Sequence, residues 1–309
     1  MPTFRELFEQ VPDAVADEVE SSKNRWRDRL QAAMRKLTRF QLVADVPIKI
    51  DAGYPDSLST LLSTPFTEEE FLAEIVSKYL FDIEALEYKG RAFAGLRGDL
   101  NVYRIGGALD QKLGDMVEGI DSTCSELRRI ATQATVKEKL MAVRDDVMGV
   151  YTYVPTLHRA VSKPEIFLFW KVIGLAAGIM KISVEDLTVL VMTHELAHAY
   201  SHLGCDASGT FWSKGFAESD INVKEGIAQY YTWAIAKYLD EHHSAQFMPS
   251  YRSKISNQAG PYRVHEPWTE KYSLEVLRSA LVHVRNATEY VTLVTFEDTL
   301  VTEQKAIRV

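Results

Sequence analysis

One segment constrains this chain more than any other: Ser183 to Leu203, SVEDLTVLVMTHELAHAYSHL. Ser183 followed three residues later by Asp186 is a variant of a helix-capping signature, and no glycine or proline interrupts the run before Gly204. At about 100° per residue, His194 and His198 lie one turn apart and leave the same face of a helix. The segment therefore predicts a helix with two imidazoles on one side.

Two neutral imidazoles at this spacing can bind one divalent cation, while Glu195 beside them reaches a water on the open side of the metal. Such a metal lowers the pKa of its water from about 16 toward 7, and the carboxylate accepts the proton as the water attacks a carbonyl. The rest of the segment is apolar nearly all round, which predicts a buried central helix. Unpartnered polar groups are costly in a core, so burial favours a metal site over a chance pattern.

The H-E-x-x-H motif of His194 to His198 resembles that of the zincin metallopeptidases, and the resemblance extends from Glu165 to about Tyr230. The metzincin subtype continues with Gly and a third His where this chain has Ser201 and Gly204. The gluzincin subtype, which takes its third ligand from a Glu on a later helix, fits better. The resemblance implies one Zn²⁺ per chain, a peptide or protein substrate, and an α+β, predominantly helical fold with a small mixed or antiparallel sheet over the motif helix.

A second helix is expected from about Ser219 to Leu239, and it carries Glu225. The spacing from His198 allows the chain to turn and bring an antiparallel helix against the first, so Glu225 could be the third ligand and leave the fourth position for water. Glu218 and Asp220 are rivals, although Glu218 is expected before the helix and an acid at Asp220 is explained by the helix dipole.

Two neighbours of these residues qualify the resemblance. Thermolysin-type gluzincins have an Asp four residues after the ligand Glu, which orients one ligand His, and this chain has Gln229 there. His202 continues the spacing after His198, but it lies about 12 Å along the axis from His194, too far to share one ion. We expect His202 to line the cleft or cap the helix.

Substrate binding is expected upstream of the motif helix and oxyanion stabilisation downstream of it. Val150 to Val154 and Glu165 to Trp170 are strand candidates. By the resemblance, Ile166 to Trp170 is the candidate edge strand that binds peptide, with an internal strand as the alternative. Gluzincins often supply a Tyr or His as oxyanion donor, which implicates the loop that holds Tyr262, Arg263 and His265.

The chain changes character near Gly149. Residues 1–149 are expected to form a mostly helical N-terminal region and residues 150–309 the zincin-like domain. Other expected elements are a strand at Val46 to Ile50, a helix from Thr67, irregular or hairpin structure from Tyr88 to Ile105, and strands at Glu289 to Phe296 and Leu300 to Val309.

Charge and cysteine usage limit the partners and the compartment. A formal net charge of -8 and a pI near 5.6 argue against nucleic acid or an anionic membrane surface as partner. No stretch is apolar for the ~18 residues of a membrane span, and the first ten residues contain acids where a signal peptide is apolar. Cys124 and Cys205 form no C-x-x-C, which favours free thiols in the cytoplasm.

Two functions remain open at this point. The first is a zinc peptidase with His194, His198 and Glu225 as ligands and Glu195 as general base, for which Tyr262 and His265 are the candidate oxyanion donors. The second is a regulatory or partner-binding protein that retains the zincin fold, with proteolysis lost or limited to one protein target.

Overall fold

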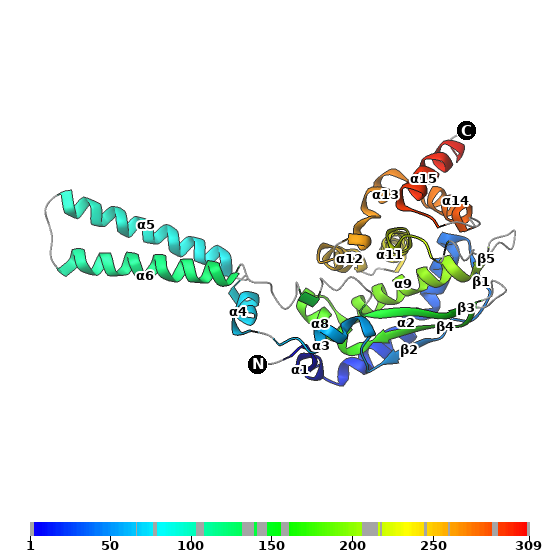
Figure 1. Ribbon diagram of the computed structural model, residues 1–309, viewed down its shortest axis with the longest axis horizontal. Coiled ribbons are helices and arrows are strands. Elements are labelled where there is room, and N and C mark those ends of the chain that lie inside the picture. The colour runs from blue at the N-terminus through cyan, green and yellow to red at the C-terminus, as the bar shows by residue number, and fades with distance from the viewer. Residues whose placement is uncertain are drawn as a thin grey trace. The chain divides into compact units, whose positions relative to one another are not determined.

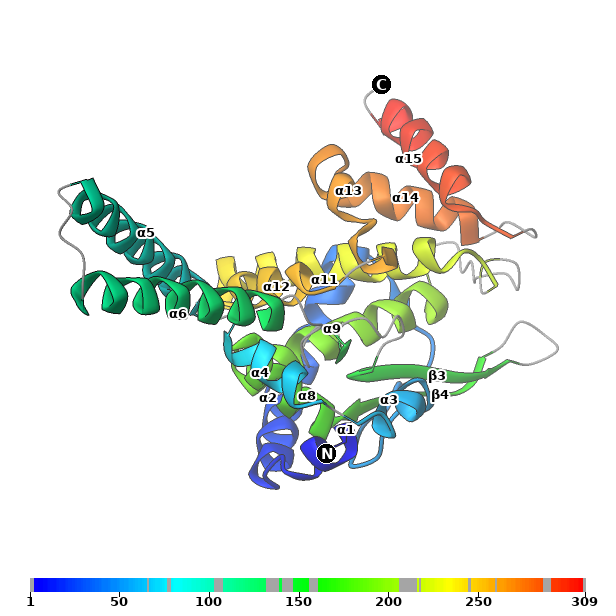
Figure 2. The same ribbon diagram turned by 60° about the vertical axis from the view of Figure 1, so that its left-hand side comes forward.

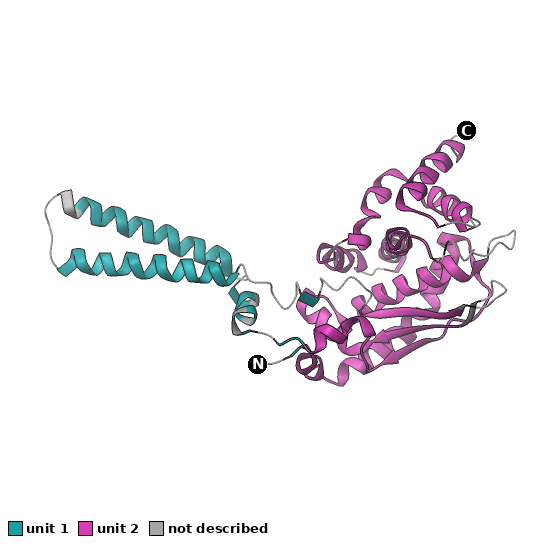
Figure 3. Ribbon diagram, viewed as in Figure 1, with its two compact units in different colours: residues 1–4, 64–140 teal, residues 5–63, 141–309 magenta. Residues whose placement is uncertain are grey.

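The structure is a computed structural model, and its chain forms two compact units (Figure 3). Unit 1 comprises Met1–Phe4 and Thr64–Leu140, and unit 2 comprises Arg5–Ser63 and Met141–Val309. The structure describes residues 3–65, 67–76, 79–102, 108–131, 139–140, 147–155, 161–205, 216, 218–243, 246–258, 260–285 and 290–307. Most of unit 1 is thus an insertion in the chain of unit 2. In the sequence, the boundaries of this insertion follow Ser63 and Leu140, whereas a single boundary was expected near residue 149.

Unit 2 is mostly helical with two small sheets, as the α+β prediction requires (Figure 1). Its elements before the insertion are α1 (Phe4–Glu9), α2 (Ala14–Thr38), β1 (Gln41–Leu42), β2 (Ile48–Asp51), η1 (Asp56–Leu58) and α3 (Ser59–Leu62). After the insertion follow β3 (Gly149–Pro155), β4 (Val161–Phe169), α8 (Trp170–Met180), α9 (Val184–Leu203), β5 (Gly204–Cys205), α11 (Ile221–His243), α12 (Phe247–Ser256), η3 (Gly260–Arg263), α13 (Glu266–Lys271), α14 (Leu274–Arg285) and α15 (Leu293–Ile307).

The larger sheet has the strand order β2-β4-β3. β2 pairs with β4 in parallel, with Ile48 opposite Ile166, and β3 pairs with β4 antiparallel, with Tyr151 opposite Ile166. The prediction that Ile166 to Trp170 forms the edge strand is therefore wrong, because β2, from before the insertion, covers the second side of β4. Among the described residues, β3 pairs only with β4 and so forms an edge of this sheet.

α9 is the central helix of unit 2 and coincides with the predicted motif helix. It begins as expected, since the Ser183 side chain accepts a hydrogen bond of 2.9 Å from the backbone N–H of Asp186. Helices α2, α8, α11 and α12 and strands β3 and β4 pack around it. Accordingly, 16 of its 20 residues are buried. The packing of α2 on α9, like the pairing of β2 with β4, explains why the segment before the insertion belongs to unit 2.

Unit 1 contains α4 (Glu68–Val76), α5 (Leu80–Val102) and α6 (Ala108–Ala131), and α5 and α6 lie side by side as a hairpin (Figures 1 and 2). The predicted helix start at Thr67 is confirmed by a reciprocal cap. The Thr67 hydroxyl accepts from the N–H of Glu70, and the Glu70 carboxylate accepts from the N–H of Thr67, each at 3.2 Å. This pairing satisfies two backbone donors at the helix end.

The prediction of irregular structure from Tyr88 to Ile105 is wrong up to Val102, because α5 continues through its glycines, and the following residues lie outside the described part. Gly90 is at the contact with α6, where a Cβ atom would lie 2.9 Å from Ile120 Cγ2. The missing side chain lets the helices approach, which offsets the entropic cost of glycine in a helix.

The C-terminal strands are also a wrong prediction, since residues 293–307 form α15. Thr292 caps this helix by accepting a hydrogen bond of 3.1 Å from the N–H of Thr295. Phe296 and Leu300, one turn apart, are both fully buried, and the helix packs against α14. In the part of the chain that is described, no helix has the length and apolar character needed to cross a bilayer.

Candidate metal centre

Three side chains from two helices converge at the middle of unit 2. His194 and His198 project from α9 and Glu225 projects from α11, which packs against α9. Their ligand atoms all lie within 4.8 Å of one another. The His194 side chain is 1% exposed, whereas His198 and Glu225 retain 12% and 11%. The structure thus brings together the three predicted metal ligands in a buried group that could hold a metal ion.

The distances within this group fit a metal ion. His194 Nε2 lies 3.1 Å from His198 Nε2 and 3.0 Å from Glu225 Oε2, and His198 Nε2 lies 3.4 Å from the same oxygen. Bonds of about 2.0–2.1 Å in a tetrahedral site place neighbouring ligand atoms about 3.3 Å apart. The three atoms are therefore spaced like three corners of such a site.

The charges of the group are strongly coupled. Burial alone would raise the pKa of Glu225, but the two histidines outweigh burial and hold that pKa well below its usual range. Burial alone would likewise lower the pKa of His198, and the Glu225 carboxylate raises it on balance. Without a metal the site therefore favours an ionised Glu225 carboxylate and a protonated His198 imidazole, and a cation that binds here would displace the His198 proton.

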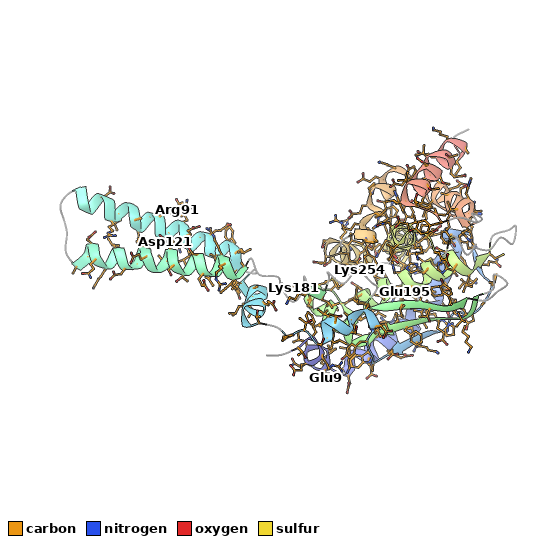
Figure 4. The ribbon with its side chains drawn as sticks, viewed as in Figure 1. Glu9, Arg91, Asp121, Lys181, Glu195 and Lys254 are labelled. Atoms are coloured by element: carbon orange, nitrogen blue, oxygen red, sulfur yellow. The ribbon has the colours of Figure 1, made fainter. Side chains whose placement is uncertain are left out.

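Glu195, whose position Figure 4 marks, is 1% exposed and lines the same cavity as His198 and Glu225. The start of β3 runs directly over it. A Cβ atom at Gly149 would lie 3.2 Å from Glu195 Cγ, 3.3 Å from its Oε1 and 2.6 Å from Val191 Cγ1. Glycine at this position therefore leaves the space in which the Glu195 carboxylate stands next to the ligands.

A cavity of about 640 Å³ opens onto the ligand group. Its walls come from β3, from the segment between β2 and η1, from the start of α11 and from η3. The lining residues are Asp51, Tyr54, Pro55, Asp56, Ser57, Val150, Tyr151, Thr152, Tyr153, Phe167, Phe169, Glu195, His198, His202, Ile221, Lys224, Glu225 and Tyr262. All three strands of the larger sheet contribute to the lining, β3 with four consecutive residues, β4 with Phe167 and Phe169, and β2 with Asp51.

The two candidate oxyanion donors are placed differently. Tyr262, on η3, lines the cavity, and its ring centroid lies 6.1 Å from that of His194. His265 is buried, is not among the residues that line this cavity, and its Nε2 is hydrogen-bonded to the Tyr251 hydroxyl. Burial lowers the pKa of His265 to about 4, so its imidazole is neutral near pH 7. Arg263 lies on the surface and pairs with Glu266.

His202 lines the cavity, which is one of its two predicted places. Its ring centroid lies 5.5 Å from that of Tyr151 and 5.4 Å from that of Tyr153. Burial is the main cause that lowers the pKa of His202 well below the usual value, and the charges of His198 and Lys224 lower it further. His202 is therefore a neutral, aromatic part of the cavity wall.

The rivals for third ligand have other positions. Asp220 precedes α11, where its Oδ1 accepts a hydrogen bond of 2.9 Å from the N–H of Asn222 and so caps the helix. Glu218 lies further from the helix start, near Tyr153. Burial is the larger cause that raises the pKa of the Tyr153 phenol, and the Glu218 carboxylate raises it further. Gln229, one turn after Glu225, is fully buried and its amide donates to Gln258 Oε1 at 3.4 Å.

Several cavity residues were missed by the sequence analysis. Tyr151 and Tyr153 were expected only as strand residues, although their spacing already places both on one face of a strand. Asp51, Tyr54 and Lys224 gave no signal, because the first two precede the insertion and Lys224 is one charge among many on a helix surface.

No family model, no curated protein and no solved structure matches this chain. The assignment of a function therefore depends on the geometry of the site itself.

Proposed function

We propose that this chain is a zinc-dependent peptidase of gluzincin type, which hydrolyses peptide bonds with metal-activated water. The observation that carries the proposal is the buried group of His194, His198 and Glu225 with Glu195 next to it at the base of an open cavity. A structural zinc site closes its fourth position with a protein ligand, whereas a catalytic site leaves it to water or substrate.

The donor set suits zinc. Two imidazoles and one carboxylate are the ligands of many catalytic zinc sites, and the same three also suit non-haem Fe²⁺. Glu195 favours a hydrolytic function, because hydrolysis requires a general base in addition to the three metal ligands. When bound, the metal would supply a Lewis acid for the scissile carbonyl and lower the pKa of a coordinated water.

In this proposal Glu195 accepts the proton of the attacking water and then delivers it to the departing amine. Its position supports both steps, since its carboxylate is held between α9 and Gly149, one residue from a metal ligand. Tyr262 faces the same cavity from η3 and would donate its phenolic O–H to the oxyanion of the tetrahedral intermediate.

The substrate would lie along β3. A strand at the edge of a sheet offers unpaired N–H and C=O groups, and an extended peptide can add to them as a further strand. The cavity runs beside Val150 to Tyr153, so such a peptide would pass directly over Glu195 and the ligand group. A protein or peptide with an extended segment is therefore the proposed substrate.

The experiment that tests the proposal combines metal analysis with a peptide-cleavage assay. The protein is purified without chelator, its zinc and iron are measured by mass spectrometry, and a quenched peptide library is offered as substrate. We expect about one zinc per chain and cleavage that a chelator stops and added zinc restores. Iron in place of zinc would reject the zinc assignment, and iron without any cleavage would reject the hydrolase as well. Bound zinc without any cleavage would favour the regulatory function with the same fold.

A further inference from the structure

The α5 helix of unit 1 carries a second apolar face that α6 does not cover. Phe81, Ala85, Tyr88 and Ala92 are separated by four, three and four residues, so they fall on one side of the helix within about 60°. All four are exposed, Phe81 by 80% and Tyr88 by 75%. We call these four residues the α5 stripe.

The opposite side of α5 is the one that contacts α6. Ile83 belongs to a small buried cluster with Ala73, Val76, Cys124 and Ile130, and Gly90 approaches Ile120. These positions lie about half a turn round the helix from the α5 stripe. The hairpin core therefore does not account for the two exposed rings.

The spacing of the α5 stripe is that of a coiled-coil seam, in which apolar residues alternate at intervals of three and four. Single exposed apolar residues are ordinary on protein surfaces. Two aromatic rings aligned with two alanines on one helix face are a more specific pattern, because the alanines leave room for rings from a second helix.

Charged residues flank the α5 stripe on both sides. Asp82 and Lys89 follow the two aromatic positions, and Glu84 and Arg91 precede the two alanines. All four are exposed, and within the described residues none of them forms an ion pair. Figure 4 marks Arg91 on α5. Neighbouring charges are paired inside the hairpin, Glu87 with Arg128 and Arg97 with Asp110.

The stripe and its flanks complement themselves under a two-fold rotation. If a second α5 packs antiparallel with the axis between Leu86 and Glu87, Phe81 faces Ala92 of the other copy and Tyr88 faces its Ala85. In an antiparallel pair of helices, flanking positions meet those of the same side. Asp82 then faces Lys89, and Glu84 faces Arg91, each pair occurring twice.

A parallel pairing fits less well. It would place ring against ring and alanine against alanine in successive layers, and it would leave Asp82 and Arg91 without an opposite charge from α5. The antiparallel arrangement matches both size and charge at all eight positions.

We propose that the α5 stripe binds the α5 stripe of a second copy of this chain as an antiparallel helix pair. Such an interface is isologous, so one surface serves both copies and the assembly closes at two. The aromatic rings supply the buried apolar area, while the flanking charges fix direction and register. This inference does not depend on the peptidase proposal, since it concerns unit 1 alone.

Sedimentation velocity of the full chain over about 1 to 100 µM tests the proposal first. We expect the mass to rise with concentration from 35.0 kDa toward twice that value. Phe81→Ser should weaken association at least tenfold. Leu109→Ser is the matched control, because Leu109 is an exposed apolar residue of α6 outside the stripe, and it should leave association unchanged.

Charge reversal tests the register. Asp82→Lys places two lysines opposite each other and Lys89→Glu places two acids opposite each other, so each variant alone should associate at least tenfold more weakly than the wild type. Mixed in equal amounts they should form a heterodimer of near wild-type affinity, because both pairs are then opposite in charge. Circular dichroism confirms that each variant is folded.

Three results would overturn the proposal. The wild type could stay at 35.0 kDa at every concentration, Phe81→Ser could associate as tightly as the wild type, or the mixture of Asp82→Lys and Lys89→Glu could fail to associate. Restored association of the mixture cannot come from a general effect of misfolding.

Discussion

The helices α9 and α5 both carry apolar residues on more than one side, and they differ in how they are covered. α5 also carries seven charged residues. α9 is packed by other elements of unit 2 on nearly every side, while α5 is packed by α6 on one side. In α9 the informative residues are therefore the few polar ones that remain in the core, and in α5 they are the apolar ones that remain in solvent.

The comparison shows that a side chain in an energetically unfavourable environment indicates a function. Burying His194 and Glu195 costs free energy unless partners compensate, and a bound metal ion would compensate for His194. Exposing Phe81 and Tyr88 costs free energy unless a partner covers them. In each helix, the feature that local folding does not explain indicates what the chain binds.

Removal of a ligand in α9 is expected to have the largest effect. His198→Ala leaves His194 and Glu225 as the remaining ligands, so the zinc content should fall to near zero and peptide cleavage should be lost. His242→Ala, an exposed histidine at the end of α11, is the control and should keep both. Zinc retained at the wild-type level in His198→Ala would contradict the ligand assignment.

Tyr262→Phe removes one donor from the cavity and keeps the ring. If Tyr262 donates to the oxyanion, kcat should fall by about 10²–10³-fold with the zinc content unchanged. Tyr290→Phe, an exposed tyrosine that does not line the cavity, is the control. A kcat within a factor of two of the wild type in Tyr262→Phe would exclude this role, on the scale of that loss.

Matched truncations measure the difference in coverage between the two helices. Leu190 of α9 is 1% exposed and Phe81 of α5 is 80% exposed. Leu190→Ala should lower the free energy of unfolding by about 2–5 kcal/mol, and Phe81→Ala by less than about 0.5 kcal/mol at concentrations where the chain is monomeric. Urea unfolding gives both values, and equal losses would contradict the described packing.

A further prediction concerns a pH dependence at His265. Its folded pKa of about 4 lies below the ordinary value of 6.5, so the unfolded chain binds the proton more readily. The free energy of unfolding is therefore not reduced by this group above about pH 6.5. It declines as the pH falls from there toward 4, by at most about 3 kcal/mol. His265→Gln should make the unfolding free energy of the metal-free protein less dependent on pH in that window. An unchanged slope would contradict the buried, neutral state of His265.

Much of the metal centre could be predicted from sequence because its signals are local. The Ser183 cap and the spacing of His194 and His198 depend on neighbours within two turns. Glu225 needed one further step, a helix that returns along the first. Tyr151 and Tyr153 could not be assigned to the cavity, because the identity of the edge strand depends on which distant strand pairs with β4.

Two of the wrong predictions also result from contacts between segments that are distant in the sequence. β2 joins the sheet from across the insertion, and no local pattern shows that Ile48 pairs with Ile166. The glycines of α5 suggested irregular structure, but Gly90 is explained only by the approach of α6. Nothing in the structure explains Gly95 and Gly98, which have open space around them. The β-branched C-terminal tail suggested strands, while the decisive features were the Thr292 cap and the burial of Phe296 and Leu300 one turn apart.

The most direct test of the metal centre as a hydrolytic site is Glu195→Gln, measured for zinc content and for cleavage of a peptide library. The account predicts about one zinc per chain in both the wild type and the variant, and a cleavage rate that falls by about 10²–10⁴-fold in the variant. Glu185→Gln, a half-buried position at the start of the same helix that pairs with Arg25, should cleave like the wild type. A wild type without bound metal, or a Glu195→Gln variant that cleaves at the wild-type rate, would contradict it.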